Sequence, residues 1–267
     1  MTAANSNRTI TRIDPDTGAR ITETYDANGY VQTEAWDFDW DEKPDEIFTF
    51  THDANGNLLN SAHDSNGDGK PEHISTIAYD ARGNLQTGKL DNNGNGETDE
   101  ILTFTLGPAY NQLTAALDSD ADGNPDQKEI WTFDAGGENK ISEVILRDTD
   151  DDGTFDRVEY RNFDTEVDTI EPTAQSAQDL AGVQTITLSD GATNLVISDS
   201  VLSVLAGGDD SYRVQIEGDE HDSVHLGQGI RDSGQDVEIN GEQYDLYTGT
   251  AGSVLVDPDV AVELAVA

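Results

Sequence analysis

The chain has 267 residues and carries 55 acidic against 14 basic side chains, which gives a formal net charge of -41. This charge argues against nucleic acids and anionic membranes as partners, because phosphate would be repelled, and it favours cations. Only 34% of the residues are hydrophobic, which indicates a thin core. The three Trp, eight Tyr and seven Phe residues nevertheless argue against a disordered chain.

The N-terminal stretch MTAANSNRTITRID lacks the apolar segment of a Sec signal peptide, so we expect any export signal to lie elsewhere. No apolar run reaches the roughly 18 residues of a membrane helix. The absence of cysteine fits a protein that is stable outside the cell without disulfides. Residues 14–18, DPDTG, are expected to form a turn.

An aspartate-rich nonapeptide occurs five times, and we name its copies loops A to E and their positions places 1 to 9. They are DFDWDEKPD (loop A, 37–45), DSNGDGKPE (loop B, 64–72), DNNGNGETD (loop C, 91–99), DSDADGNPD (loop D, 118–126) and DTDDDGTFD (loop E, 148–156). The first four loops begin 27 residues apart, and loop E follows after 30.

A second motif keeps the same interval. It reads YDANGY (25–30), HDANGN (52–57), YDARGN (79–84), LGPAYN (106–111) and FDAGGE (133–138). Two independent motifs with one period indicate a true internal repeat. The three extra residues before loop E therefore lie between Phe133 and Asp148.

The segments between the motifs are rich in β-branched and aromatic residues, which predicts strands. These segments are 47–51, 74–79, 101–106, 129–133 and 158–163, with return strands at 30–36, 84–90 and 111–117. Asn-Gly and Gly-Asn turns join the strands at the edge opposite the loops. The sequence thus predicts a mainly β fold, with an elongated array of antiparallel β-hairpins over residues 1–163.

Each loop places oxygen-bearing side chains at places 1, 3, 5 and 9, and four of the five have glycine at place 6. Turns favour Asp, Asn and Gly in general, which would explain one such loop but not five in phase. Ca²⁺ takes six to eight oxygen ligands, including backbone carbonyls, and a glycine permits the sharp turn. Mg²⁺ fits less well, because it keeps its waters and requires a rigid octahedron. We therefore predict about five Ca²⁺ sites.

The loops are not EF-hands, since only loops D and E have Glu at place 12 and there it falls within the next strand. They resemble the DxDxDGxxD loops between strands of integrin α-chain propellers and the aspartate loops of thrombospondin type 3 repeats. The resemblance implies calcium binding, with the carbonyl of Asn124 as a further ligand in loop D. The predicted metal-binding residues are Asp37, Asp39, Asp41, Asp45, Asp64, Asn66, Asp68, Glu72, Asp91, Asn93, Asn95, Asp99, Asp118, Asp120, Asp122, Asn124, Asp126, Asp148, Asp150, Asp152 and Asp156.

The copies differ in expected strength. Loops D and E keep four carboxylates, whereas Asn93 and Asn95 lower the charge of loop C and should weaken its binding. Loop A has Glu42 at the glycine place, which puts its turn geometry in question. The segment YDARGNL (79–85) also resembles the YD repeats of Rhs-type proteins, but only in the turn motif, so it implies hairpin architecture and no more.

Residues 164–184 contain Pro172 and small polar residues, and they are predicted to form a linker. Residues 185–267 are predicted to form a small β-rich domain. Its one short helix is expected at SDSVLSVLAG (198–207), with Ser198 or Asp199 as the N-cap.

Three segments of this region resemble the module near the C-terminus of type I-secreted RTX adhesins: YRVQIEGDEHDSVHL (212–226), NGEQYDLYTG (240–249) and GSVLVDPDVAV (252–262). The resemblance implies an extracellular bacterial protein, exported through an ABC-type channel by a C-terminal signal. The tail DPDVAVELAVA is compatible with such a signal. The GGxGxDxLx nonapeptides that define the RTX class are missing.

No catalytic motif is found: GxSxG, HExxH and a phosphate loop are all absent from the sequence. His221 and His225 would share one face of a strand and form a zinc pair only if HDSVH were a strand, and a surface pair is favoured. Of the tryptophans, Trp131 is expected to pack in the core. The protein is predicted not to be an enzyme.

These features predict a secreted, calcium-stabilised structural or adhesive protein, a self-associating component of an extracellular matrix, a surface layer or an adhesin. Unpaired edge strands and calcium-bridged acidic faces would mediate self-association. The alternative is a carbohydrate- or surface-ligand-binding module that uses Trp40. A halophilic protein would spread its acids evenly, whereas here they cluster at a fixed interval.

Overall fold

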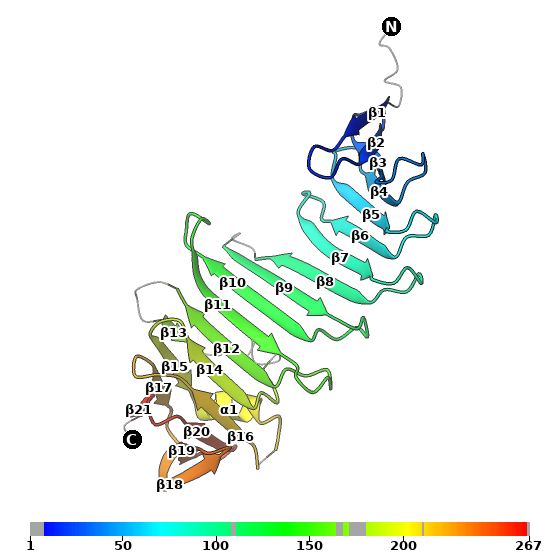
Figure 1. Ribbon diagram of the computed structural model, residues 1–267. Coiled ribbons are helices and arrows are strands. Elements are labelled where there is room, and N and C mark those ends of the chain that lie inside the picture. Colours follow the sequence, from blue (N-terminus) through cyan, green and yellow to red (C-terminus); the bar gives the residue numbers. More distant parts are fainter. Residues whose placement is uncertain (1–7, 108–110, 164–167, 171–179, 210, 266–267) are drawn as a thin grey trace. The chain divides into compact units, whose positions relative to one another are not determined.

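The structure is a computed structural model that describes residues 8–107, 111–163, 168–170, 180–209 and 211–265. These residues form 21 strands and one helix, which confirms the mainly β fold (Figure 1). The helix is too short and too polar to cross a membrane. The chain divides into unit 1 (Met1–Phe104 with Asp118–Gly123) and unit 2 (Thr105–Leu117 with Asn124–Ala267). The domain division predicted around residues 164–184 stays a prediction.

Unit 1 is an antiparallel meander in which each strand pairs with the next. Its strands are β1 (Arg8–Ile13), β2 (Arg20–Tyr25), β3 (Val31–Asp37), β4 (Glu46–His52), β5 (Leu58–Asp64), β6 (His73–Tyr79), β7 (Leu85–Asp91) and β8 (Glu100–Leu106, whose last two residues belong to unit 2). The turn expected at 14–18 joins β1 to β2, and Asp14 Oδ1 accepts the N–H of Thr17 at 2.8 Å.

The second motif forms the turns opposite the loops. The strand register shifts at Tyr25, His52 and Tyr79, the first residue of each motif copy. The aspartate that follows holds the turn: Asp53 Oδ1, for example, accepts the N–H groups of Asn55 at 2.8 Å and Asn57 at 2.9 Å. The motif is therefore a hydrogen-bonded turn. The copy at 106–111 lies partly outside the described residues.

Unit 1 has almost no hydrophobic core. Among its residues that the structure describes, Ala19 and Ile21 are the only buried hydrophobic ones. Its other buried residues are acidic, namely Glu23, Asp37, Asp64, Asp91 and Asp118. The last four are the place-1 aspartates of loops A to D, so most of the buried side chains of this unit belong to the loops.

Unit 2 begins with the same antiparallel pattern and then becomes parallel. Its first strands pair in chain order: β9 (Gln112–Asp118, of which Asp118 belongs to unit 1), β10 (Gln127–Phe133), β11 (Lys140–Arg147) and β12 (Arg157–Asn162). Strand β12 next pairs in parallel with β14 (Thr185–Ser189). The hairpin sheet therefore continues directly into the C-terminal strands.

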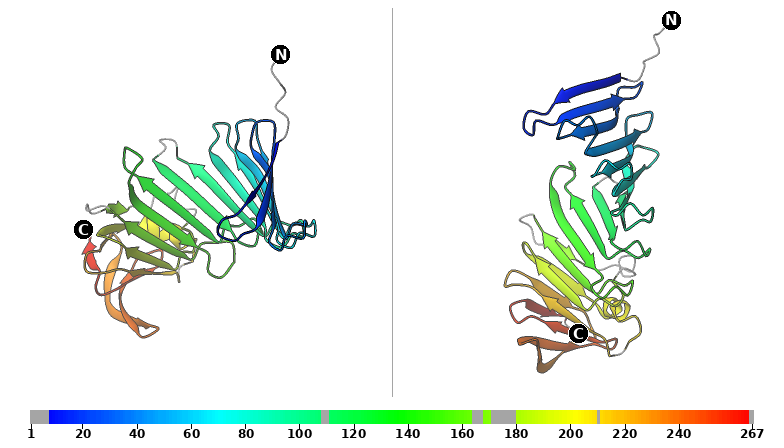
Figure 2. Two further views of the ribbon diagram at one scale, coloured as in Figure 1. Left: turned by 45° about the horizontal axis from the view of Figure 1, so that its top comes forward. Right: turned by 45° about the vertical axis from the view of Figure 1, so that its right-hand side comes forward.

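The C-terminal strands alternate between two sheets (Figures 1 and 2). In one sheet β14, β16 (Arg213–Glu217) and β20 (Ser253–Val256) are parallel, and β19 (Glu242–Thr248) and β18 (Arg231–Ile239) extend it antiparallel. The other sheet is wholly parallel and contains β13 (Asp168–Ile170), β15 (Thr193–Ile197), β17 (Ser223–Leu226) and β21 (Ala261–Leu264). The sequence predicted a β-rich region here but not its parallel pairing.

A hydrophobic core fills this part of unit 2. Helix α1 (Asp199–Leu205) is capped by Ser198, whose Oγ accepts the N–H of Val201 at 3.2 Å, as predicted. Its Leu202 and Leu205 join the buried cluster that includes Val214 and Leu226. The predicted linker contributes to the core as well: besides β13, it contains Leu180 and Val183, both buried. Its residues 164–167 and 171–179 lie outside the described part.

Asp222 is a buried carboxylate in the region that resembles the RTX module. Its Oδ1 accepts the N–H of Thr193 at 2.9 Å, and its Oδ2 accepts the N–H of Asp219 at 3.0 Å. Burial raises the pKa of this carboxyl group. A Cβ on Gly218 would lie 2.8 Å from Asp222 Oδ2, which explains the glycine four residues earlier. Through these two hydrogen bonds, Asp222 of the G-x-x-x-D pattern links β15 to the turn before β17.

We expect Asp222→Asn to lower the free energy of unfolding by about 2 kcal/mol, because an amide oxygen accepts only one of the two N–H groups and its NH₂ group opposes the other. Chemical denaturation at fixed calcium concentration measures this change. Glu220→Gln, at an exposed position two residues away, is the control and should have no effect. Equal stability of the two variants would contradict the structural role of Asp222.

Candidate metal sites

Loops A to E share one backbone conformation. Place 4 is left-handed in every loop, with φ of 65° at Trp40, 66° at Gly67, 67° at Gly94, 58° at Ala121 and 58° at Asp151. Place 6 is left-handed as well, with φ of 73° at Glu42, 88° at Gly69, 88° at Gly96, 103° at Gly123 and 85° at Gly153. Loop A therefore makes the same turn as the others, with a strained glutamate in place of glycine.

The place-1 aspartate organises each loop. Its Oδ2 accepts the place-6 N–H in all five copies, at 3.2 Å in loop A, 2.7 Å in B, 2.8 Å in C, 2.9 Å in D and 2.7 Å in E. The N–H of place 9 then donates to the carbonyl of the residue before place 1, again in all five. These bonds close the loop at the end of a strand.

The remaining ligand places bond inside the loop. In loop A the N–H of Asp41 donates to Asp39 Oδ1 at 3.0 Å, and the N–H of Lys43 donates to Asp41 Oδ1 at 2.8 Å. Loops B and C repeat both bonds with Asn or Asp as the acceptor. Backbone N–H groups therefore fix the side chains at places 3 and 5 in these three loops.

In four loops the carboxylate oxygens converge so that all lie within 4.8 Å of one another. The groups are Asp37, Asp39 and Asp41 in loop A, Asp64, Asp68 and Glu72 in loop B, Asp118, Asp120 and Asp122 in loop D, and Asp148, Asp150 and Asp152 in loop E. Loop C forms no such group, because Asn93 and Asn95 replace its carboxylates.

Place 9 joins the carboxylate group only in loop B, where the longer Glu72 reaches it. The place-9 carboxylate accepts the place-2 N–H in loops A, B and C, at 2.7 Å each for Asp45, Glu72 and Asp99. Asn93 donates its side-chain N–H to Asp99, and Asn66 donates to Glu72. Asp126 and Asp156 lie outside the carboxylate groups of loops D and E. In loops A, D and E the carboxylates at places 1, 3 and 5 thus gather more tightly than the one at place 9.

Charge crowding differs between the loops. Burial and the neighbouring carboxylates of Asp152, Asp156 and Asp148 raise the pKa of Asp150 in loop E. In loop B the N–H and hydroxyl of Ser65 hold the pKa of Glu72 below its usual value. A counter-charge in loop E would relieve this repulsion.

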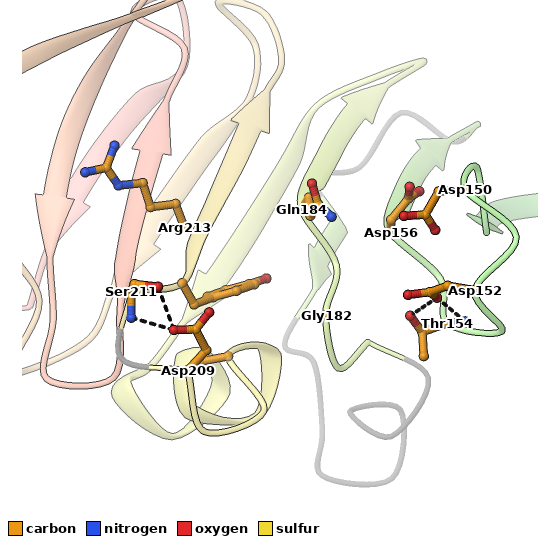
Figure 3. A pocket seen from close by; sticks show the side chains of 11 residues that line it. Asp150, Asp152, Thr154, Asp156, Gly182, Gln184, Asp209, Ser211 and Arg213 are labelled. Carbon is orange, nitrogen blue, oxygen red and sulfur yellow. Dashed lines mark hydrogen bonds between the residues drawn. The ribbon is translucent and has the colours of Figure 1, made fainter.

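A cavity of about 440 Å³ opens beside loop E (Figure 3). Asp150, Asp152 and Asp156 line one side, and Asp209 and Ser211, from the turn that follows α1, line the other. The Oδ1 atom of Asp156 is shielded from solvent and has no hydrogen-bond partner. That oxygen is available to a cation in the loop.

The histidines and tryptophans form no joint site. His221 lies in the turn before β17 and His225 on β17, so they do not share a strand face as the HDSVH segment had suggested. His221 Nδ1 lies 3.1 Å from Asp219 Oδ1, and His225 Nδ1 lies 3.6 Å from Glu263 Oε2. The partly buried Trp131 donates its Nε1–H to Glu143.

We expect Glu42→Gly to raise the free energy of unfolding by about 1 kcal/mol, because glycine adopts a positive φ without the strain of an L side chain. Denaturant unfolding in EGTA measures this effect without bound calcium. Glu42→Gln removes the charge but keeps the strain, and it should give a smaller gain. A loss of stability in Glu42→Gly would contradict the strain at place 6.

Comparisons with known proteins leave the family open. No protein-family model matches the chain, and no curated protein matches it. Among solved structures, a protein of unknown function from Bacteroides fragilis NCTC 9343 is similar over 57% of this chain and 88% of its own, with 10% sequence identity and a TM-score of 0.21.

Proposed function

We propose that loops A to E bind Ca²⁺ and that the chain is a secreted, calcium-stabilised structural or adhesive protein. The observation that supports this proposal best is the single conformation of five loops that differ in sequence. In each, a place-1 aspartate is held by the place-6 N–H, and in four of them three carboxylates converge within 4.8 Å. Like charges held so close together repel each other, and a bound cation would offset this repulsion.

The thin core of unit 1 gives the cations a structural purpose. With two buried hydrophobic residues in its described part, this sheet gains little from apolar burial. A site filled at a hundred times its dissociation constant adds about 2.7 kcal/mol, so five sites add about 13 kcal/mol. That gain equals the whole stability of an ordinary domain. Calcium would therefore decide whether the hairpins are ordered.

Self-association follows from the sheet edges. Within the described residues β1 pairs only with β2, and β18 only with β19. Such edges offer unpaired N–H and C=O groups to another strand. Strand β18 is interrupted by a register shift between Asp232 and Asp236, a feature that protects edges, whereas β1 is regular. We propose β1 as the edge through which copies associate in a matrix, surface layer or adhesin.

An extracellular location is part of the same proposal. It is supported by the sequence resemblance of residues 212–262 to the C-terminal module of RTX adhesins and by the need for high calcium. Intracellular calcium is kept low, so loops of this kind would fill only after export. Export by a type I, ABC-type channel would deliver the chain before its hairpins become rigid.

We expect the chain to bind about five Ca²⁺ ions per molecule and to melt at a much higher temperature in millimolar calcium than in EGTA. Calorimetric titration and thermal unfolding measure the two quantities. The double variant Asp120→Asn, Asp122→Asn should lose one site and a matching part of the stabilisation. Its control, Asp16→Asn, changes an acidic residue outside the loops and should retain all sites.

A chain that melts identically in calcium and in EGTA would contradict the proposed function. Sedimentation of the same samples tests association: larger species should form in calcium and dissociate in EGTA. A monomer under both conditions would contradict the self-association through β1 but not the calcium binding.

A carbohydrate-binding module is the second candidate, because Trp40, at place 4 of loop A, is 54% exposed next to converging carboxylates. Its ring is held by the Nε1–H bond to Gly18 O at 3.2 Å. We expect Trp40→Ala to abolish any binding on a glycan array in calcium buffer, because an exposed indole is the stacking surface. Trp36→Phe is the matched control, since Trp36 is half-buried. Unchanged binding by Trp40→Ala would contradict this function.

A further inference from the structure

Consecutive loops of unit 1 lie in backbone contact. Gly67, at place 4 of loop B, faces the carbonyl of Pro44, at place 8 of loop A, so closely that a Cβ on Gly67 would lie 2.1 Å from that oxygen. Gly94, at place 4 of loop C, has the same relation to Pro71 of loop B, at 2.0 Å. No side chain fits between these loops, and one loop forms the surface on which the next one rests.

The contacting atoms are next to the ligands. Place 8 immediately precedes the place-9 carboxylate, and in loop C the N–H of Gly94 at place 4 donates to Asp91 Oδ1 at 2.7 Å. A shift of the Pro71 peptide would therefore displace a donor to the place-1 aspartate of the next loop.

Within unit 2, the last three residues of loop D, Asn124–Asp126, contact loop E. The N–H of Asp148, at place 1 of loop E, donates to the carbonyl of Asp126, at place 9 of loop D, at 2.9 Å. Gly153 packs against the side chain of Asn124, and a Cβ there would lie 3.3 Å from Asn124 Cγ. A peptide bond of one candidate site is thus hydrogen-bonded to a ligand residue of the next.

We infer that loops A, B and C bind cations cooperatively through the contacts between their backbones. Without an ion, the gathered carboxylates repel and loosen the loop. An ion in one loop fixes its place-8 and place-9 peptides, and this prepares the contact surface for the neighbour. The inference rests on the proposed calcium binding. Couplings between sites commonly change affinity about 5- to 150-fold.

Terbium luminescence tests the coupling at loop A. Trp36 precedes loop A and Trp40 lies within it, so excitation of these tryptophans sensitises the luminescence of Tb³⁺ bound to loop A. The chain's third tryptophan is removed by carrying out all measurements in a full-length Trp131→Phe background. Asp68→Asn with Glu72→Gln disables loop B. We expect the affinity of loop A for Tb³⁺ to fall at least about fivefold in this variant. Asp150→Asn with Asp152→Asn disables loop E in unit 2 and should leave loop A unchanged.

A matched glycine pair separates coupling from misfolding. Gly67→Ala and Gly94→Ala introduce the same strain, at φ of 66° and 67°, and clash with equivalent carbonyls. Gly67→Ala breaks the contact between loops A and B and should weaken Tb³⁺ binding at loop A, whereas Gly94→Ala should affect it less. Equal loop A affinity in all variants would overturn the coupling and leave calcium binding intact. Absence of terbium binding at loop A in the parent chain would overturn both.

Discussion

The hydrogen bonds that the place-1 aspartates accept from their own loops are the interaction on which the hairpin array depends. A buried carboxylate is normally a cost, and it is tolerated here because backbone N–H groups surround it. For Asp91, burial opposes ionisation, but the N–H groups of Gly96, Asn93 and Gly94 outweigh it and lower the pKa of the carboxyl group. The loop is thus preformed around a negative charge, and the carboxylates at the other ligand places add further negative charge.

The hairpin meander of unit 1 and the two-sheet region of unit 2 differ in the kind of side chain that they bury. In unit 1 the strands of a single meander leave most side chains half-exposed, and the shielded groups are acidic. In the C-terminal part of unit 2, two sheets and α1 enclose an ordinary apolar cluster. Under the proposed function, only unit 1 would depend on ions for its cohesion. A calcium-free chain would therefore keep its C-terminal core while the hairpins of unit 1 loosen.

The hairpins could be predicted from the sequence because their two motifs mark both turns of every repeat, and β4, β6 and β10 lie within two residues of their expected bounds. The helix cap at Ser198 was equally local. The parallel pairing of β14 with β12 was not predictable, because it joins residues that are 28 positions apart and belong to no hairpin motif. At the loops, the sequence predicted ligands at places 1, 3, 5 and 9, but it could not show that the place-9 carboxylates Asp45, Glu72 and Asp99 accept the place-2 N–H. Of these three, Glu72 has the longest side chain, and it also belongs to a carboxylate group.

The longer interval before loop E shows how such an array accommodates insertions. The turn from Asp134 to Asn139 is one residue longer than the turn from Asp80 to Asn84, and both are closed by the same bond. The other two residues extend the segment of β11 between this turn and loop E. Two residues span one full pleat, so every side chain of that strand keeps its side of the sheet. A turn of this array can therefore take an insertion of a single residue, whereas a strand keeps its side-chain pattern only when an even number of residues is inserted.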